Sequence, residues 1–173
     1  MITDETCAAD THVRGACYYR KGRKMHRIFG KKKAMPYFDR RGAYIVPFRE
    51  EKIALVKTPR GYFLIGGGIE ENETHAEAIV RECMEETGCR AEIGKYVCSA
   101  ETYTFYPKFG HYHPIQAYYL GEISDPVQSR QDEDHRLVWA EYADMRGKLC
   151  LEMQNWALEM CRKAFEEMKN GGH

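Results

Sequence analysis

The sequence predicts an α/β fold in one domain, within a chain of 173 residues. Two observations favour this class. Segments rich in β-branched and aromatic residues lead into a glycine loop and then into a helix with clear start and stop signals. A second long amphipathic helix follows near the C-terminus. Because each helix has an apolar face to bury, we expect a mixed sheet between the two helices.

Three strands are expected first, because runs of aliphatic and aromatic residues are separated by turn-like sequence. They are Ala43–Phe48, Ile53–Thr58 and Gly61–Ile65. The charged residues between the first two suit a hairpin connection. The three glycines at 66–68 then predict a stop to regular structure.

A helix is expected between Thr74 and Gly88. Thr74 suits the N-cap, and Glu77 three residues later completes a capping-box pattern. Gly88 suits the position that follows the last helical residue. Apolar residues at helical spacing predict the buried face of this helix: Ala76, Ile79, Val80 and Cys83.

Three more strands and a long helix complete the expected elements. The strands lie at about Glu92–Phe105, Gln116–Ile123 and Arg136–Ala140. The helix spans about Leu149–Lys169. Its apolar residues recur at spacings of three and four, which predicts a core-facing stripe of Leu149, Met153, Trp156, Met160, Ala164 and Met168.

Composition excludes several classes of protein. No apolar run approaches the roughly 20 residues that a transmembrane helix needs, so no membrane partner is expected. No secretory signal is visible in the first 30 residues, which predicts a cytoplasmic location. The seven cysteines are odd in number and include no CxxC pair, which argues against a disulfide framework and a zinc ribbon.

Charge is unevenly distributed although the net charge is zero. Residues 1–41 hold 11 Lys or Arg against 4 Asp or Glu, whereas residues 42–173 hold 15 against 22. The acidic body argues against a nucleic-acid surface over the whole domain. Within the basic part, residues 18–33 hold eight Lys or Arg and no acid. This stretch is either a solvated arm or a surface for an anionic partner, such as nucleic acid or polyphosphate.

Three glutamates of the predicted helix share one face, because Glu82, Glu85 and Glu86 lie at positions i, i+3 and i+4. Like charges at these spacings repel by roughly a few tenths of a kcal/mol per pair. The last turn of a helix also favours cations, and Arg81 offsets only one pair. Function explains the cluster better, since grouped carboxylates suit Mg²⁺ or Mn²⁺ and a glycine loop lets the backbone approach a metal or phosphate.

The segment from 67 to 89 resembles the Nudix box, G-x5-E-x7-R-E-U-x-E-E-x-G-U, where U is aliphatic. Every fixed position matches at the right spacing: Gly67, Glu73, Arg81, Glu82, Glu85, Glu86 and Gly88. Cys83 and Cys89 fill the two U positions. The order of elements from about 29 to 139 is also similar to that of small bacterial, MutT-like Nudix hydrolases. The resemblance implies an α/β/α sandwich around a mixed sheet.

What the resemblance implies for activity is hydrolysis of a nucleoside diphosphate linked to a moiety X, by attack of water on phosphorus with a divalent metal. The implied metal ligands are Glu82, Glu85, Glu86 and the carbonyl of Gly66. Because residues 1–25 lie outside the resemblance, we expect them to form a basic, flexible arm. The hydrolase domain would then cover residues 26–173.

Other roles follow from the same resemblance. Glu82 is expected to act as base toward water, and Arg81 and Glu73 to brace the carboxylates. Nudix enzymes often add an acidic residue from a loop that precedes a late strand. We expect Glu133 in that role, with Asp132 and Asp134 as alternatives.

Substrate contacts are signalled more weakly. The aromatic stretch from 103 to 112 can stack a base or pack within the sheet, and its candidates are Tyr103 and Tyr106. Arg40 and Arg41, just before the first expected strand, are either phosphate contacts or plain solvent-exposed residues. The alternative to hydrolysis is a catalytically weak nucleotide-binding or regulatory module, with accessory anion binding by the basic arm. The expected partner is a small nucleotide-type molecule, and a homodimer is left open.

Overall fold

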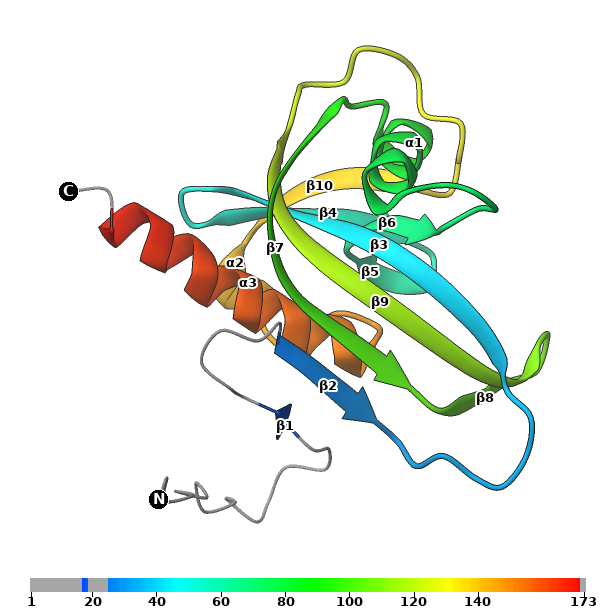
Figure 1. Cartoon of the computed structure of the whole chain (residues 1–173). Helices are drawn as coiled ribbons and strands as arrows, with labels where there is room; N and C mark the ends of the chain where they lie inside the picture. Colours follow the sequence, from blue (N-terminus) through cyan, green and yellow to red (C-terminus); the bar gives the residue numbers. More distant parts are fainter. Residues whose placement is uncertain (1–16, 19–24, 172–173) are drawn as a thin grey trace, which may run out of the picture.

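The computed structural model describes residues 17–18 and 25–171, which form ten strands and three helices (Figure 1). The elements are β1 (Cys17–Tyr18), β2 (Met25–Phe29), β3 (Phe38–Arg49), β4 (Lys52–Thr58), β5 (Gly61–Phe63), β6 (Ile65–Gly68), α1 (His75–Thr87), β7 (Ala91–Thr102), β8 (Thr104–Tyr106), β9 (Gly110–Ile123), β10 (Arg136–Glu141), α2 (Tyr142–Met145) and α3 (Glu152–Asn170).

The strands form one mixed sheet in the order β1-β2-β7-β9-β3-β4-β10. The β2–β7 and β3–β9 pairs are parallel, and the other pairs along this path are antiparallel. The short strands β5, β6 and β8 pair with β4, β3 and β9. Helices α1 and α3 lie on opposite faces of the sheet (Figure 1). The expected arrangement, a mixed sheet between two helices, is confirmed.

Two apolar cores result, one under each helix. Beneath α1, Ala78, Ile79 and Cys83 are fully buried against β3, β4 and β6. Ala76 and Val80 are exposed, so the buried face of α1 is turned from the one predicted. The α3 core includes Met153, Trp156, Leu158, Cys161 and Ala164, while Met168 at the end of the helix is exposed. None of the helices in the described part of the chain is both long and apolar enough to cross a membrane.

Strand β2 contradicts the interpretation of the basic stretch as a solvated arm over residues 25–29. Residues 30–33 are exposed, and residues 19–24 lie outside the described part. The residues of β2 pair in parallel with β7, from Met25 with Cys98 to Phe29 with Thr102. Phe29 is only 3 % exposed, and the Arg27 guanidinium lies over its ring. The sequence did not predict this strand, because its few apolar residues lie among many Lys and Arg residues. The arm predicted for residues 1–25 lies almost entirely outside the described residues and stays a prediction.

The glycines at 66–68 do not end regular structure, because they continue β6 beside β3. Gly66 has a φ of 135°, and a Cβ there would collide with the Ala43 carbonyl. A side chain at position 66 in this conformation would therefore clash with the β3 backbone, whereas at 67 and 68 it would meet the side chains of Glu82 and Arg40. The glycines thus leave room for the β3 backbone and for two side chains, and they do not stop the strand.

Candidate active site

Caps at both ends of α1 fix which residues face the sheet. At the start, the Thr74 hydroxyl accepts from the Glu77 amide at 3.2 Å, and the Glu77 carboxylate accepts from the Thr74 amide at 2.8 Å. At the end, Gly88 is left-handed with a φ of 72°, and its amide donates to the Met84 carbonyl. These predicted caps hold the glutamates of the last turns in one register.

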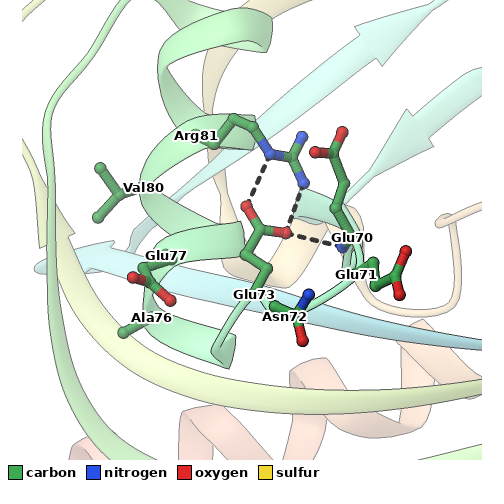
Figure 2. Close-up of a pocket in the computed structure, with 8 residues that line it drawn as sticks. All are labelled: Glu70, Glu71, Asn72, Glu73, Ala76, Glu77, Val80 and Arg81. Atoms are coloured by element: carbon green, nitrogen blue, oxygen red, sulfur yellow. Dashed lines mark hydrogen bonds and ion pairs between the residues drawn. The ribbon is translucent and has the colours of Figure 1, made fainter.

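Arg81 ties three segments together. Its Nε and Nη2 donate to the two oxygens of Glu73 at 2.8 and 2.9 Å, as Figure 2 shows. Nη2 also donates to the Gly68 carbonyl at 2.9 Å, and Nη1 donates to Glu82 Oε1 at 2.9 Å. The Glu85 carboxylate lies 3.5 Å from Nη1. Hydrogen bonds from Arg81 lower the pKa of Glu73 to about 2, so this carboxyl stays ionised.

Glu82 lies directly beneath the glycine strand. A Cβ at Gly67 would collide with the Glu82 carboxylate. Absence of a side chain at 67 is therefore what lets Glu82 approach the β6 backbone. Burial raises the pKa of Glu82, although Arg81 acts in the opposite direction. The site thus holds a partly desolvated carboxylate that a cation would stabilise.

Glu86 is the most buried of the three glutamates, with 7 % of its surface exposed. Its Oε2 accepts from the Gly66 amide at 3.1 Å, and its Oε1 lies 3.3 Å from His135 Nδ1. Burial raises the pKa of Glu86, and Glu86 in turn raises the pKa of His135. His135 was not predicted, because no sequence spacing links it to α1.

The loop before β10 covers the C-terminal end of α1. The amides of Gln131 and Asp132 donate to the Glu85 carbonyl at 2.8 and 3.3 Å. Asp132 Oδ2 then lies 3.2 Å from His135 Nδ1, so it reaches the group that contacts Glu86. Glu133 is exposed, and its backbone carbonyl accepts from Arg130. The structure therefore favours Asp132 over Glu133 as the loop carboxylate near the cluster.

The carboxylate oxygens of the three α1 glutamates are ligands that suit a hard divalent cation. Glu82, Glu85 and Glu86 supply carboxylate oxygens, and burial disfavours the charges of Glu82 and Glu86. Arg81 is the cation that contacts Glu82 and Glu85. Within residues 17–18 and 25–171, no three His, Cys, Asp or Glu side chains already converge in a ligand geometry. The carboxylates are instead held by Arg81, Gly66 and His135.

A cavity of about 680 Å³ opens beside this cluster. Gly66, Glu86 and His135 line it, together with basic Arg60 and Lys108. The β8–β9 hairpin adds a group of aromatic rings, stacked or tilted at centroid distances of 5.3 to 6.4 Å: Tyr106, Phe109 and Tyr112. Carboxylates, cations and aromatic rings thus line one space.

Of the residues predicted to contact substrate, Tyr106 lines the cavity, whereas Tyr103 and Arg41 do not. Tyr106 lines the cavity, and its hydroxyl accepts from Arg60 at 3.4 Å. Tyr103 lies outside the cavity lining, where it stacks on His113 at 4.1 Å and donates to Glu101. Arg41 is exposed, whereas the guanidinium of its neighbour Arg40 lies against Gly68 of the glycine strand.

A second hollow, of about 620 Å³, lies over the outer side of Arg81 (Figure 2). Its lining includes four glutamates and one arginine: Glu70, Glu71, Glu73, Glu77 and Arg81. An acidic lining repels an anion. The cavity beside Glu86 is mixed in charge instead, because Arg60 and Lys108 line it together with Glu86 and Asp134.

Comparison with known proteins gives one family and a set of similar folds. The family model described as NUDIX domain matches residues 39–163. A NUDIX hydrolase from Nitrosomonas europaea is 20 % identical with a TM-score of 0.61, covering 73 % of this chain and 90 % of its own. A MutT NUDIX hydrolase from Burkholderia pseudomallei is 24 % identical with a TM-score of 0.58, covering 71 % and 98 %.

An ADP-ribose pyrophosphatase from Streptococcus suis is similar as well. It is 19 % identical with a TM-score of 0.56, and the match covers 73 % of this chain and 91 % of that one. No curated protein matches this chain. At these identities the solved structures support the fold, and the family model supports the family.

Proposed function

The chain belongs to the Nudix family of hydrolases, and we propose that it cleaves a diphosphate linkage in a nucleoside diphosphate joined to a second moiety. Water would attack one phosphorus, the bond from that phosphorus to the bridging oxygen would break, and the other phosphate group would leave with that oxygen. The expected cofactor is Mg²⁺ or Mn²⁺. One observation carries this proposal: Glu82, Glu85 and Glu86 lie on α1 beside a glycine strand that leaves room for Glu82.

The groups that would hold the cation are Glu82, Glu85, Glu86 and the Gly66 carbonyl. A divalent cation there neutralises charge on phosphate oxygens and makes the attacking water more acidic. Among the side chains, Glu82 is our choice of base toward water. Arg81 keeps Glu82 in place through Nη1, and Glu73 holds Arg81.

The substrate would occupy the cavity beside Glu86. Arg60 and Lys108 offer positive charge to an anion, and the aromatic rings of the hairpin offer stacking surfaces to a base. This combination fits a molecule that carries both phosphate and an aromatic ring system. Loop residue Asp132, brought near Glu86 through His135, would supply the additional carboxylate.

The alternative is a nucleotide-binding regulatory module without turnover. An intact set of carboxylates argues against it, because a binding module does not need to hold Glu82 against its desolvation cost. A cytoplasmic location, the role of the basic arm and a homodimer stay predictions.

A substrate panel tests the proposal. It would compare nucleoside triphosphates, ADP-ribose, NADH, dinucleoside polyphosphates, sugar nucleotides and coenzyme A, each with Mg²⁺ and with Mn²⁺. We expect release of a phosphorylated product from at least one class, and its loss in Glu82→Gln. Binding of these compounds without turnover would favour the regulatory module instead.

A further inference from the structure

A buried chain of hydrogen bonds links α3 to the cavity wall through side chains that are not needed for the proposed chemistry. It starts at the Leu64 backbone, passes through the amides of Gln154 and Gln116, and ends at the Tyr44 hydroxyl. Gln154 is 1 % exposed and Gln116 is 5 % exposed. Buried polar groups are retained only where they are satisfied, so the direction of each bond in this chain matters.

The Leu64 amide sets that direction, because a backbone N–H can only donate. It donates to Gln154 Oε1 at 3.0 Å, which turns Gln154 Nε2 toward Gln116. Gln154 Nε2 donates to Gln116 Oε1 at 3.3 Å, and the Tyr118 hydroxyl donates to the same oxygen at 2.7 Å. Gln116 Nε2 is therefore the atom that faces Tyr44, and it donates to Tyr44 Oη at 3.2 Å.

Tyr44 Oη is thus an acceptor within the chain, and its own proton is left for another partner. No group in the described part of the protein accepts that proton. A tyrosine hydroxyl keeps its proton at neutral pH, since its ordinary pKa is about 10. The chain therefore ends in a hydrogen-bond donor.

Tyr44 stands beside the carboxylate cluster. It is the register partner of Gly66, and both residues line the 680 Å³ cavity together with Glu86. At this place the proposed substrate would carry its diphosphate, with the base toward the aromatic hairpin. A phosphate oxygen can accept the hydrogen bond that the protein leaves unpaired.

We infer that the Tyr44 hydroxyl donates to an oxygen of a nucleoside diphosphate group bound in the cavity, in a direction fixed by the amides of Gln154 and Gln116. Tyr44 is a binding residue in this inference, and Gln116 and Gln154 are positioning residues. The inference rests on the proposed function, because it takes the occupant to be a nucleoside diphosphate.

Tyr44→Phe and Tyr118→Phe form a matched pair for the test. Each removes one hydroxyl that is bonded to Gln116, but Tyr118 is fully buried and does not line the cavity. ADP binding in the presence of Mg²⁺ would be measured by calorimetry on the full chain. We expect Tyr44→Phe to weaken ADP binding about 10- to 100-fold, since a hydrogen bond to a charged group is lost. Tyr118→Phe should bind ADP as the wild type does.

A double-mutant cycle tests the amide chain. Gln116→Met frees the Tyr44 hydroxyl to rotate, so it should weaken ADP binding when Tyr44 is present. Gln116 and Gln154 also line the cavity, so a direct effect on ADP remains in the Tyr44→Phe background. The same change should nevertheless have a clearly smaller effect there, because the part that runs through the Tyr44 hydroxyl is lost. If Gln116→Met does not fold, Gln154→Met replaces it in the cycle, because Gln154 is the next residue in the chain of hydrogen bonds.

Several outcomes would overturn the inference. These are wild-type protein that does not bind ADP, equal binding by Tyr44→Phe and wild type, equal losses in both tyrosine variants, or fully additive losses in the cycle. The proposed function fails separately. Wild type that binds ADP but hydrolyses nothing in the substrate panel would refute the function while the binding inference stands.

Discussion

Arg81 and Glu73 form a two-pronged ion pair, with Nε and Nη2 donating to the two carboxylate oxygens at 2.8 and 2.9 Å. The pair joins the loop before α1 to the middle of the helix (Figure 2). Because the same guanidinium reaches Glu82, Glu85 and the Gly68 carbonyl, its plane fixes the carboxylates relative to the glycine strand. A planar fork is needed for this, and an ammonium cannot replace it.

Arg81→Lys should therefore keep the positive charge but lose the planar set of hydrogen bonds to Glu73, Glu82 and the Gly68 carbonyl. Misplacement of a catalytic group by about 1 Å can lower a rate about 100-fold, and we expect a fall in kcat of that order. Turnover with Mg²⁺ is the measurement. Arg90→Lys, an exposed position just after α1, is the matched control and should retain activity. Equal turnover in Arg81→Lys and wild type would show that charge alone suffices.

Gly67→Ala should displace Glu82, because the added Cβ would meet the Glu82 carboxylate. We expect kcat to fall by about 10-fold or more, since the base is moved from its place. Gly68→Ala is the neighbouring comparison, where the Cβ meets the end of the exposed Arg40 side chain, which can move away. Its loss of turnover should be clearly smaller. A reversed order of the two variants would contradict the placement of Glu82.

The parts of this structure that the sequence predicted are those set by local signals. Capping residues and glycine spacing predicted α1 and the glutamates that it carries. His135, Asp132 and Tyr44 join the site only through the sheet and the loop before β10, and no local pattern reports such contacts. Tyr103 and Tyr106 are three residues apart, yet only Tyr106 faces the cavity. Tyr103 lies between β7 and β8, whereas Tyr106 lies in β8, so the direction of each side chain depends on how the chain turns between these strands.

Strand β2 predicts where the folded domain begins, and two truncations test this boundary. Deleting residues 1–24 should leave the fold in place, whereas deleting 1–29 also removes Met25 and Phe29 from the α3 core. Burial of a Phe side chain contributes about 1.5–3 kcal/mol, and the β7 edge would lose its parallel partner. Melting temperatures of the two truncations decide the point. A shorter truncation that is unfolded would show that residues before Met25 also stabilise the domain.

Removal of divalent cations should abolish hydrolysis. Glu82, Glu85 and Glu86 would repel a diphosphate unless a cation lies between them, and Arg81 is already paired with Glu73 and Glu82. Excess chelator should stop turnover of whichever substrate the panel identifies, and added Mg²⁺ or Mn²⁺ should restore it. Full activity in excess chelator would rule out the proposed metal dependence.

Glu82→Gln and Glu86→Gln should separate activity from stability. Each substitution keeps shape and polarity but removes a charge that the cation needs, so kcat should fall by orders of magnitude. Stability should be unchanged or slightly raised, because repulsion within the glutamate cluster is relieved, worth roughly a few tenths of a kcal/mol. At Glu86 an unfavourable interaction with the helix dipole is also removed, roughly 0.3–1 kcal/mol.

The contacts of Glu86 show why the amide can be accommodated. A Gln oxygen can accept from the Gly66 amide as Oε2 does now, while the amide nitrogen faces His135 Nδ1, which accepts when that nitrogen is unprotonated. Melting temperature in chelator, paired with turnover in Mg²⁺, is the decisive measurement. Glu167→Gln, an exposed glutamate near the end of α3, is the control and should retain turnover. If Glu86 mainly supports the fold, its Gln variant will instead melt many degrees lower and keep its turnover.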